Sequence, residues 1–198
     1  MARVDFLGYV DSGMMGDATN DEPWTFWQAD VESAARRLAA VLEEEGADAL
    51  TIYDDNGLYG HPDHIQVHRV GMRAAELAGV TRVLEGTVNR TAANRMIQAQ
   101  REMAETELPE GVELPDVIDI GLEDHLLTHS ADVKAVALRK RDALRRHRSQ
   151  VDDGHWFLAM PEETFVEAMG TEWFRAHGPV DDEGSPLHGI VVPYTPVG

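Results

Sequence analysis

The chain contains no cysteine, and this absence narrows its chemistry before any motif is considered. Without thiols it can form no disulfide bond and offers no thiolate nucleophile. Any metal ion would have to be bound by histidine, aspartate or glutamate. The lack of disulfides fits a reducing compartment, and we expect the protein to be cytoplasmic.

Basic residues are also scarce, with 17 Lys and Arg against 36 Asp and Glu and a formal net charge of -19 at pH 7. A surface of that charge repels DNA, RNA and anionic lipid, so we expect no nucleic-acid partner. No apolar run approaches the roughly 20 residues of a membrane-spanning helix. Met1 to Gly13 lack the basic and then apolar order of a secretory signal, and we expect no membrane association.

The 198 residues suit a single domain in which β-prone apolar runs alternate with helical patterns. The patterns predict strands at 3–10, 49–53, 80–88, 117–120 and 189–192, and helices at 30–46, 62–79, 91–107 and 131–150. This alternation predicts an α/β fold, Rossmann-like, with a mostly parallel sheet and helices on both faces.

The densest chemical signal lies at residues 53–68 (YDDNGLYGHPDHIQVH), with histidines at positions 61, 64 and 68. Spacings of three and four place these side chains on one face of a helix. Pro62 and Asp63 both suit a first helical turn, which would follow a strand at the sheet edge where ligands bind. Spacing alone leaves two interpretations open: a metal or catalytic site, or a helix start with solvent-facing imidazoles. One turn also offers too few ligands for catalytic zinc, which takes about three from the protein.

Three motifs resemble the LmbE/PIG-L family of zinc-dependent N-acetyl deacetylases. Residues 53–64 closely resemble the second signature of that family, and residues 7–14 (LGYVDSGM) resemble its LG-x-x-DSGM segment. Residues 144–150 (LRRHRSQ) resemble its late A-L-x-x-H-x-S-Q helix. The motifs stand in the family order and cover most of the chain. The first two are similar in form to the mycothiol-related actinobacterial branch.

The resemblance implies a role for five residues. His64 matches the histidine zinc ligand, and His61 matches the general acid or oxyanion stabiliser. Asp63 matches a carboxylate that orients this imidazole, and Tyr59 matches a tyrosine that polarises the amide carbonyl. Asp11 matches a carboxylate that binds sugar hydroxyls, although an Asx-turn explains it equally well.

The other polar residues of these motifs are expected to be structural. We interpret His68 as a solvated or packed histidine, and Arg139 to Arg148 as a solvated helix face. A structural role is also expected for His147, Ser149 and Gln150.

The sequence departs from the family pattern at its first signature, A-H-P-D-D-E, which supplies a second histidine ligand, a carboxylate ligand and the aspartate general base. The sequence has one His-Pro-Asp, at 61–63, and the Asp pairs at 54–55, 152–153 and 181–182 do not follow His-Pro. We therefore expect a domain that lacks its N-terminal βα units. Its zinc site would be incomplete and the central edge of its sheet would be open.

Three functions remain possible. The first is a zinc-dependent hydrolase that removes an N-acetyl group from a small-molecule amino sugar or its conjugate. The second is a non-catalytic remnant or sugar-binding protein. The third is one half of a split deacetylase whose partner carries HPDDE. The open edge also predicts either marginal stability or protection by a partner chain or a homo-oligomer.

Overall fold

The structure, a computed structural model, describes residues 3–107, 117–148, 151 and 156–196. Its helices are α1 Val31–Glu45, α2 Gly57–Gly60, α3 Pro62–Ala78, α4 Arg90–Glu107, α5 Ala137–Leu144, α6 Trp156–Ala159 and α7 Glu162–Met169. Its strands are β1 Leu50–Tyr53, β2 Val83–Thr87, β3 His129–Asp132, β4 Thr171–His177 and β5 Val192–Pro193. Short 3-10 helices occupy Ala18–Asp21, Asp124–Leu126 and Lys134–Val136. The fold is therefore α/β, as predicted.

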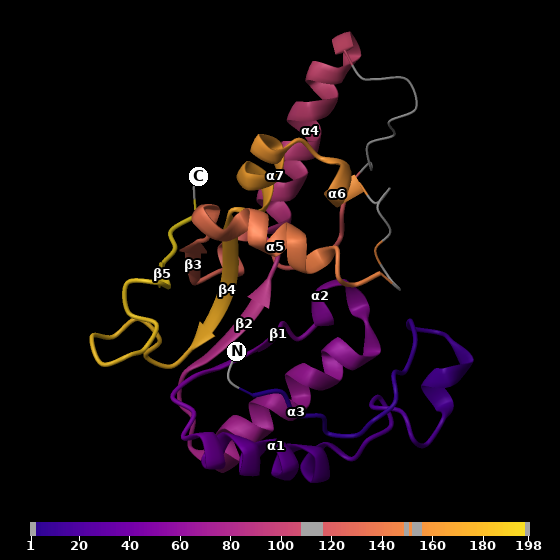
Figure 1. The fold of residues 1–198 in the computed structure, drawn as a ribbon, viewed down its shortest axis with the longest axis vertical. Helices are drawn as coiled ribbons and strands as arrows, with labels where there is room; N and C mark the ends of the chain where they lie inside the picture. The colour runs from indigo at the N-terminus through magenta and orange to yellow at the C-terminus, as the bar shows by residue number, and fades with distance from the viewer. Residues whose placement is uncertain (1–2, 108–116, 149–150, 152–155, 197–198) are drawn as a thin grey trace.

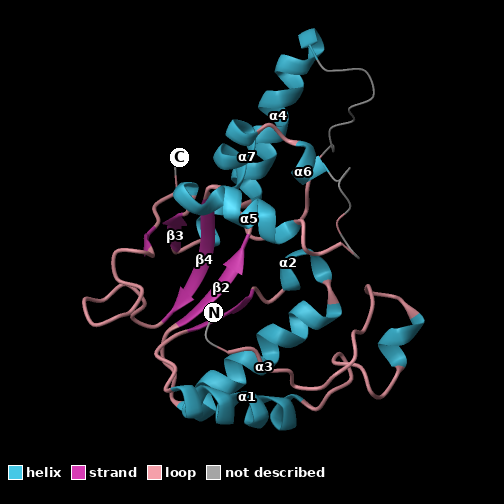
Figure 2. Cartoon of the chain, in the orientation of Figure 1, coloured by secondary structure: helices cyan, strands magenta, loops and turns pink. Residues whose placement is uncertain are grey.

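The five strands form one mixed sheet in the order β1-β2-β4-β3-β5 (Figure 2). β1 and β2 are parallel, with Leu50 opposite Val83, whereas the other pairings in the described residues are antiparallel. The prediction of a mostly parallel sheet was therefore wrong. The reason is β4, which the sequence patterns did not predict and which lies antiparallel between β2 and β3. β1 lies at one end of this order, so its outer edge has no strand partner within the described residues.

One face of the sheet is covered by a pair of helices, α3 against the strands and α1 against α3 (Figure 1). Small residues let the two helices approach closely. The cluster between them consists of Ala34, Ala35, Ala39, Leu42, Val70 and Ala74. Ala75 of α3 packs on Ile52 and Val83 of the sheet. A Cβ at Gly71 would lie 2.5 Å from the Ile52 side chain, so this contact requires glycine.

Helices were expected on both faces of the sheet, but on the opposite face the core around Leu84 has another composition. Leu84 points to this side, because successive side chains of a strand alternate. It packs in a cluster with Val180 and Val191, which belong to the irregular C-terminal segment. Loop residues therefore form the core on this face.

The two helices predicted near the candidate site are confirmed, together with their ends. The Asp30 side chain accepts the Ser33 amide at the start of α1, and Gly46 ends the helix in the left-handed conformation. Pro62 occupies the first turn of α3, and Gly79 ends it in the same way as Gly46. The predicted helix at 91–107 corresponds to α4.

Three other predictions differ from the structure. Residues 3–10 form no strand and take part only in an isolated bridge, between Val10 and Thr25. Residues 117–120 form no strand. The predicted helix at 131–150 is confirmed only over α5, Ala137–Leu144: β3 and a 3-10 helix precede it, and residues 145–148 are not helical. Each of these differences depends on which segments pair, and single-segment patterns do not contain that information.

The segment before α1 exposes several large apolar side chains, namely Val4, Phe6, Val10, Met14, Met15 and Trp24. We call these the N-terminal apolar residues. The backbone of this segment lies along α1, because Arg37 donates to the Leu7 carbonyl and Arg3 pairs with Glu45. None of the helices in the described residues combines the length and apolar character needed to cross a membrane.

Candidate active site

The candidate site begins where β1 ends, in a tightly constrained loop. Asp54 is fully buried; its Oδ1 accepts the Leu58 amide at 2.8 Å and its Oδ2 accepts the Thr87 hydroxyl at 2.5 Å. Leu58 has φ 67° and ψ -62°, the only positive φ at a non-glycine residue in the described part of the chain. Such a conformation costs about 1–3 kcal/mol and persists only where surrounding contacts enforce it. The Gly121 amide supplies one of these contacts, since it donates to the Leu58 carbonyl at 2.7 Å.

His61 ends this loop and caps α3. Its Nδ1 accepts the backbone amide of Asp63 at 3.1 Å, so Nδ1 carries a lone pair rather than a proton. The imidazole proton of the neutral ring is therefore on Nε2. His61 thus presents an N–H donor at the helix N-terminus, where the helix dipole also favours negative charge.

His64 lies one turn further along α3 with the opposite tautomer. Its Nδ1 lies 3.3 Å from the Gly57 carbonyl, which can only accept, so Nδ1 bears the proton and Nε2 bears the lone pair. Burial lowers the pKa of His64, and the neighbouring His61 lowers it further. A neutral imidazole whose other nitrogen donates to a carbonyl is the usual form of a histidine metal ligand.

The aromatic rings around these histidines form one continuous stack. The Tyr53 and His64 ring centroids are 3.8 Å apart, and those of His61 and His64 are 4.8 Å apart. Tyr59 meets His64 edge-on at 5.2 Å and remains 44% exposed. Burial raises the pKa of Tyr59, and the charge of Asp11 raises it further. The structure therefore brings Tyr59, His61 and His64 together, and hydrogen bonds from Ser12, the neighbour of Asp11, to Asp63 hold the Asp11 loop at the same helix start.

The Asp63 carboxylate does not contact the imidazole in the described hydrogen bonds, although its backbone amide does. Its two oxygens accept from the amide and the hydroxyl of Ser12, at 3.1 and 2.5 Å. Ser12 is fully buried, and its hydroxyl also accepts the Trp27 amide at 2.9 Å. Asp63 therefore fixes the loop that carries Asp11 onto the start of α3.

Asp11 itself forms the predicted Asx-turn. Its Oδ1 accepts the Gly13 amide at 2.8 Å, and the residue remains exposed. The turn leaves Oδ2 free of a partner within the described residues. The sugar-binding interpretation of Asp11 stays a prediction.

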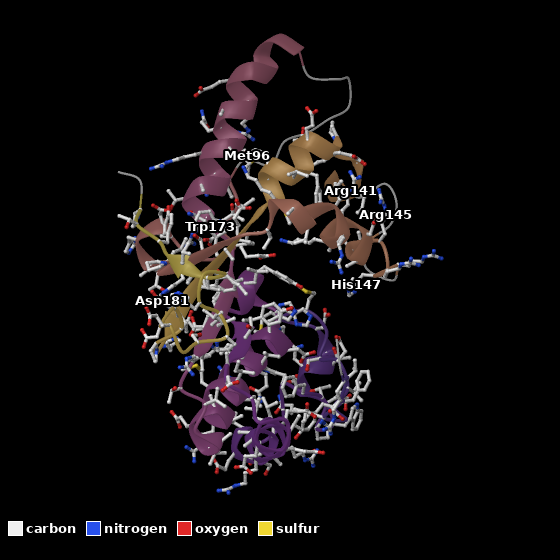
Figure 3. The ribbon with its side chains drawn as sticks, turned by 60° about the vertical axis from the view of Figure 1, so that its left-hand side comes forward. Met96, Arg141, Arg145, His147, Trp173 and Asp181 are labelled. Carbon is white, nitrogen blue, oxygen red and sulfur yellow. The ribbon has the colours of Figure 1, made fainter. Side chains whose placement is uncertain are left out.

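The remaining motif residues were expected to be structural, and several of them lie in the described part of the chain. His68 is packed, with Nδ1 3.3 Å from the Tyr53 carbonyl and a side chain 18% exposed. Arg145 and His147 lie at the outer side beyond the end of α5 (Figure 3), in agreement with a solvated face. Arg141 of the same run is instead buried and bonds to Glu162 at 2.7 Å. Ser149 and Gln150 lie outside the described residues.

The sequence patterns did not identify Ser12 and Thr87 as site residues, although their partners are in the quoted motifs. Ser12 stands in the LGYVDSGM segment, where its position between Asp11 and Gly13 suggested only a turn. Thr87 ends β2 and meets Asp54 only because β1 and β2 are adjacent. A threonine in a strand has no local feature that indicates such a partner.

The residues present do not fit a complete zinc site. Within the described ranges, no group of three or more His, Asp or Glu side chains is arranged to hold a metal ion. The lone pair of His64 is suitable for one metal bond, whereas catalytic zinc needs about three protein ligands.

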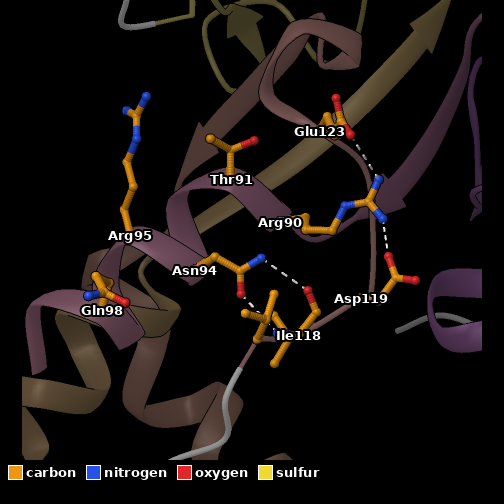
Figure 4. Close-up of a pocket in the computed structure, with 9 residues that line it drawn as sticks. Arg90, Thr91, Asn94, Arg95, Gln98, Ile118, Asp119 and Glu123 are labelled. Carbon is orange, nitrogen blue, oxygen red and sulfur yellow. Dashed lines mark hydrogen bonds and ion pairs between the residues drawn. The ribbon is translucent and has the colours of Figure 1, made fainter. Parts of the chain in front are cut away.

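One surface groove is a further candidate for a ligand site, although none of its lining side chains is a histidine. It has a volume of about 600 Å³ and lies between α4 and residues 117–123 (Figure 4). Arg90 within it pairs with Asp119 and Glu123, and Asn94 bonds to the backbone of Ile118, while Arg95 points away from these pairs. Because the central polar groups bond to one another, the groove indicates no particular ligand.

Comparison with known proteins identifies close relatives, although no family model matches the chain. The chain is 37% identical over 187 residues to a 1D-myo-inositol 2-acetamido-2-deoxy-alpha-D-glucopyranoside deacetylase of Catenulispora acidiphila, covering 86% of this chain and 58% of that protein. It is 38% identical over 175 residues to the deacetylase of the same name from Acidothermus cellulolyticus, covering 85% and 60%. For the Thermobifida fusca deacetylase of that name the identity is 40% over 194 residues, covering 90% and 67%.

The chain thus spans about three fifths of the length of the first two of these curated relatives. The similarity nevertheless extends over 85 to 90% of this chain. On these matches, the chain belongs to the LmbE/PIG-L family.

Proposed function

We propose that this chain carries part of the active site of an amidase that removes the N-acetyl group of a glucosaminyl conjugate. The observation that carries the proposal is the cluster of Tyr59, His61 and His64 at the carboxyl end of β1, within a YGHPDH segment of this family. The names of the relatives suggest the substrate class, an N-acetylglucosamine joined to myo-inositol.

The tautomers of the two histidines suggest a role for each of them in amide hydrolysis, and Tyr59 and Asp11 can assist. The Nε2–H of His61 is a donor for the amide oxygen as negative charge develops there, and the Tyr59 hydroxyl is a second donor. The lone pair on His64 Nε2 is available to a metal ion. The free oxygen of Asp11 can accept a hydrogen bond from a sugar hydroxyl.

The described residues lack a set of groups that could activate water, since no three potential ligands come together. We therefore propose that hydrolysis requires a further polypeptide segment, outside these 198 residues, that supplies the metal ligands and the base of the A-H-P-D-D-E signature. The outer edge of β1 has no strand partner among the described residues and is adjacent to the histidine loop, residues 54–61. An added strand at this edge would bring such residues closest to the loop.

The test is complementation. The chain and a polypeptide that spans the N-terminal third of the Thermobifida fusca relative would be mixed with zinc and N-acetylglucosaminyl-inositol, and free amine would be measured. We expect activity from the mixture, none from the chain alone, and none from a mixture in which the chain carries His64→Ala. Activity of the chain alone would contradict the proposal.

A second candidate, a sugar-binding protein without catalysis, is favoured by the absence of a ligand set in the described residues. It predicts that the conjugate binds the chain alone and that the mixture releases no amine. Calorimetric titration of the conjugate into the isolated chain, beside the amine assay, distinguishes the two.

A further inference from the structure

A buried carboxylate lies near the candidate site, on β2, the strand between β1 and β4. Glu85 has a side chain only 1% exposed, and apolar Val83 and Leu84 precede it in the strand. A buried carboxylate is costly unless it is paired and hydrogen-bonded. Glu85 meets this requirement with two groups of β4: Arg175 Nε donates to its Oε2 at 2.5 Å and His177 Nε2 lies 2.8 Å from its Oε1. His68 of α3 is the third neighbour, with Nδ1 3.5 Å from Oε1.

Arg175 extends this network to the histidine loop. Its Nη2 lies 3.1 Å from Asp55 Oδ1, so the guanidinium bridges β2 and the loop. The planar fork of arginine can hold two carboxylates at once, which a lysine ammonium on a flexible stem does less well. Asp55 directly follows Asp54 and lies four residues before Tyr59. Arg175 therefore gives the loop a second contact with the sheet, in addition to the Asp54–Thr87 contact.

His68 provides a second connection from Glu85 to the site. Its Nδ1 lies 3.3 Å from the Tyr53 carbonyl as well as near Glu85, and both neighbours are acceptors. Nδ1 therefore carries the proton and shares it between them. This hydrogen bond holds the backbone of Tyr53, whose ring stacks on His64 with the centroids 3.8 Å apart.

We propose that Arg175, anchored by Glu85, is a positioning residue of the candidate active site, and that it acts through Asp55 to hold the loop that carries Tyr59 and leads to His61. This inference rests on the proposed function only for the chemistry of the site. The geometry that it concerns can be tested without catalysis.

Hydrogen exchange of the loop amides is the direct measurement. The amides of Gly57, Leu58 and Gly60 are bonded within the loop, to the Asp54 carbonyl, Asp54 Oδ1 and the Asn56 carbonyl. The variants are Asp55→Asn, at a side chain 55% exposed, and Arg175→Lys, which keeps the charge but not the fork. We expect these amides to exchange about three- to fivefold faster in both variants, the range that an ion pair of this exposure supports. The double variant should exchange no faster than either single one, because both remove the same contact.

The matched control is Arg145→Lys, which alters the exposed pair of Arg145 with Asp142 on α5 and should leave the loop unchanged. The ring-proton NMR signals of His61 and His64 should shift in the two test variants and not in the control. Unchanged loop exchange in Asp55→Asn would overturn the proposal. Equal acceleration in α1 would also overturn it, since Arg175 would then only stabilise the whole fold.

A kinetic measurement separates this inference from the proposed function. In the complemented enzyme we expect Asp55→Asn to lower kcat while KM changes less than about twofold, because the catalytic donors are displaced and the sugar contacts are not. If the unaltered mixture releases no amine, the proposed function fails and the exchange result still decides the role of Arg175.

Discussion

Ser12→Ala tests the junction between the two loops of the candidate site. The substitution removes a hydroxyl that donates to Asp63 at 2.5 Å and accepts the Trp27 amide at 2.9 Å, at a fully buried position. A hydrogen bond to a charged group contributes about 1.5–3 kcal/mol, and a buried amide left without a partner costs about 1–3 kcal/mol. The Ser12 amide remains bonded to Asp63 and offsets part of this loss. We therefore expect the free energy of unfolding to fall by about 2–4 kcal/mol.

Thermal unfolding followed by circular dichroism and by tryptophan fluorescence measures the effect. For a chain of this size each kcal/mol lowers Tm by about 2–4 °C, so we expect a decrease of roughly 5–15 °C. The control is Ser130→Ala, since Ser130 is partly buried and its hydroxyl has no hydrogen bond among the described residues. Fluorescence of Trp27, whose ring packs 4.8 Å from the Arg69 guanidinium, should change in Ser12→Ala alone. A Tm decrease below about 2 °C with unchanged fluorescence would refute the reasoning.

Four further outcomes are expected. Elemental analysis of the chain purified with zinc should find clearly less than one zinc per chain, because too few ligands come together; one tightly held zinc would contradict this. In the complemented enzyme, His64→Ala should lose zinc and activity together, whereas His61→Ala should keep zinc and lower turnover by roughly 10²–10⁴-fold; equal zinc retention in both would exclude these roles. Burial raises the pKa of Tyr53 and Tyr59, so their contribution to stability is complete below about pH 10 and is lost as the pH rises through the raised pKa. Absorbance titration should show two late phenols, one lost in Tyr53→Phe and the other in Tyr59→Phe, and two ordinary titrations would refute this. Light scattering should detect self-association or aggregation of the isolated chain, because the N-terminal apolar residues and the β1 edge are exposed; a well-melting monomer would contradict it.

Local sequence signals were sufficient for the helices beside the site. Asp30 and Gly46 mark both ends of α1, and Pro62 and Gly79 mark α3. Each of these residues acts on its own helix end, so a short window of sequence contains the whole signal. The positions of His61 and His64 at the start of α3 followed for the same reason.

The sheet and the contacts around the site depend on pairs that are distant in the sequence. Ser12 and Asp63 are 51 residues apart, and Glu85 and Arg175 are 90 apart. β4 (TEWFRAH) alternates polar and apolar residues only loosely, and it becomes a strand because β2 and β3 both offer it an antiparallel edge. Glu85 is a single carboxylate next to apolar residues in a strand, and this pattern predicts that it has a buried partner. The pattern does not indicate which residue that partner is.

The late position of Arg175 has a consequence for how the protein is made. β1, α3 and β2 are complete by residue 87, whereas β4 begins at residue 171. The histidine loop and Glu85 are therefore synthesised before Arg175, the residue of β4 that pairs with both Asp55 and Glu85. Long-range strand pairing is slow compared with helix formation. The helix pair is thus expected to form early during synthesis, and the histidine loop should acquire its native shape only after β4 has been synthesised.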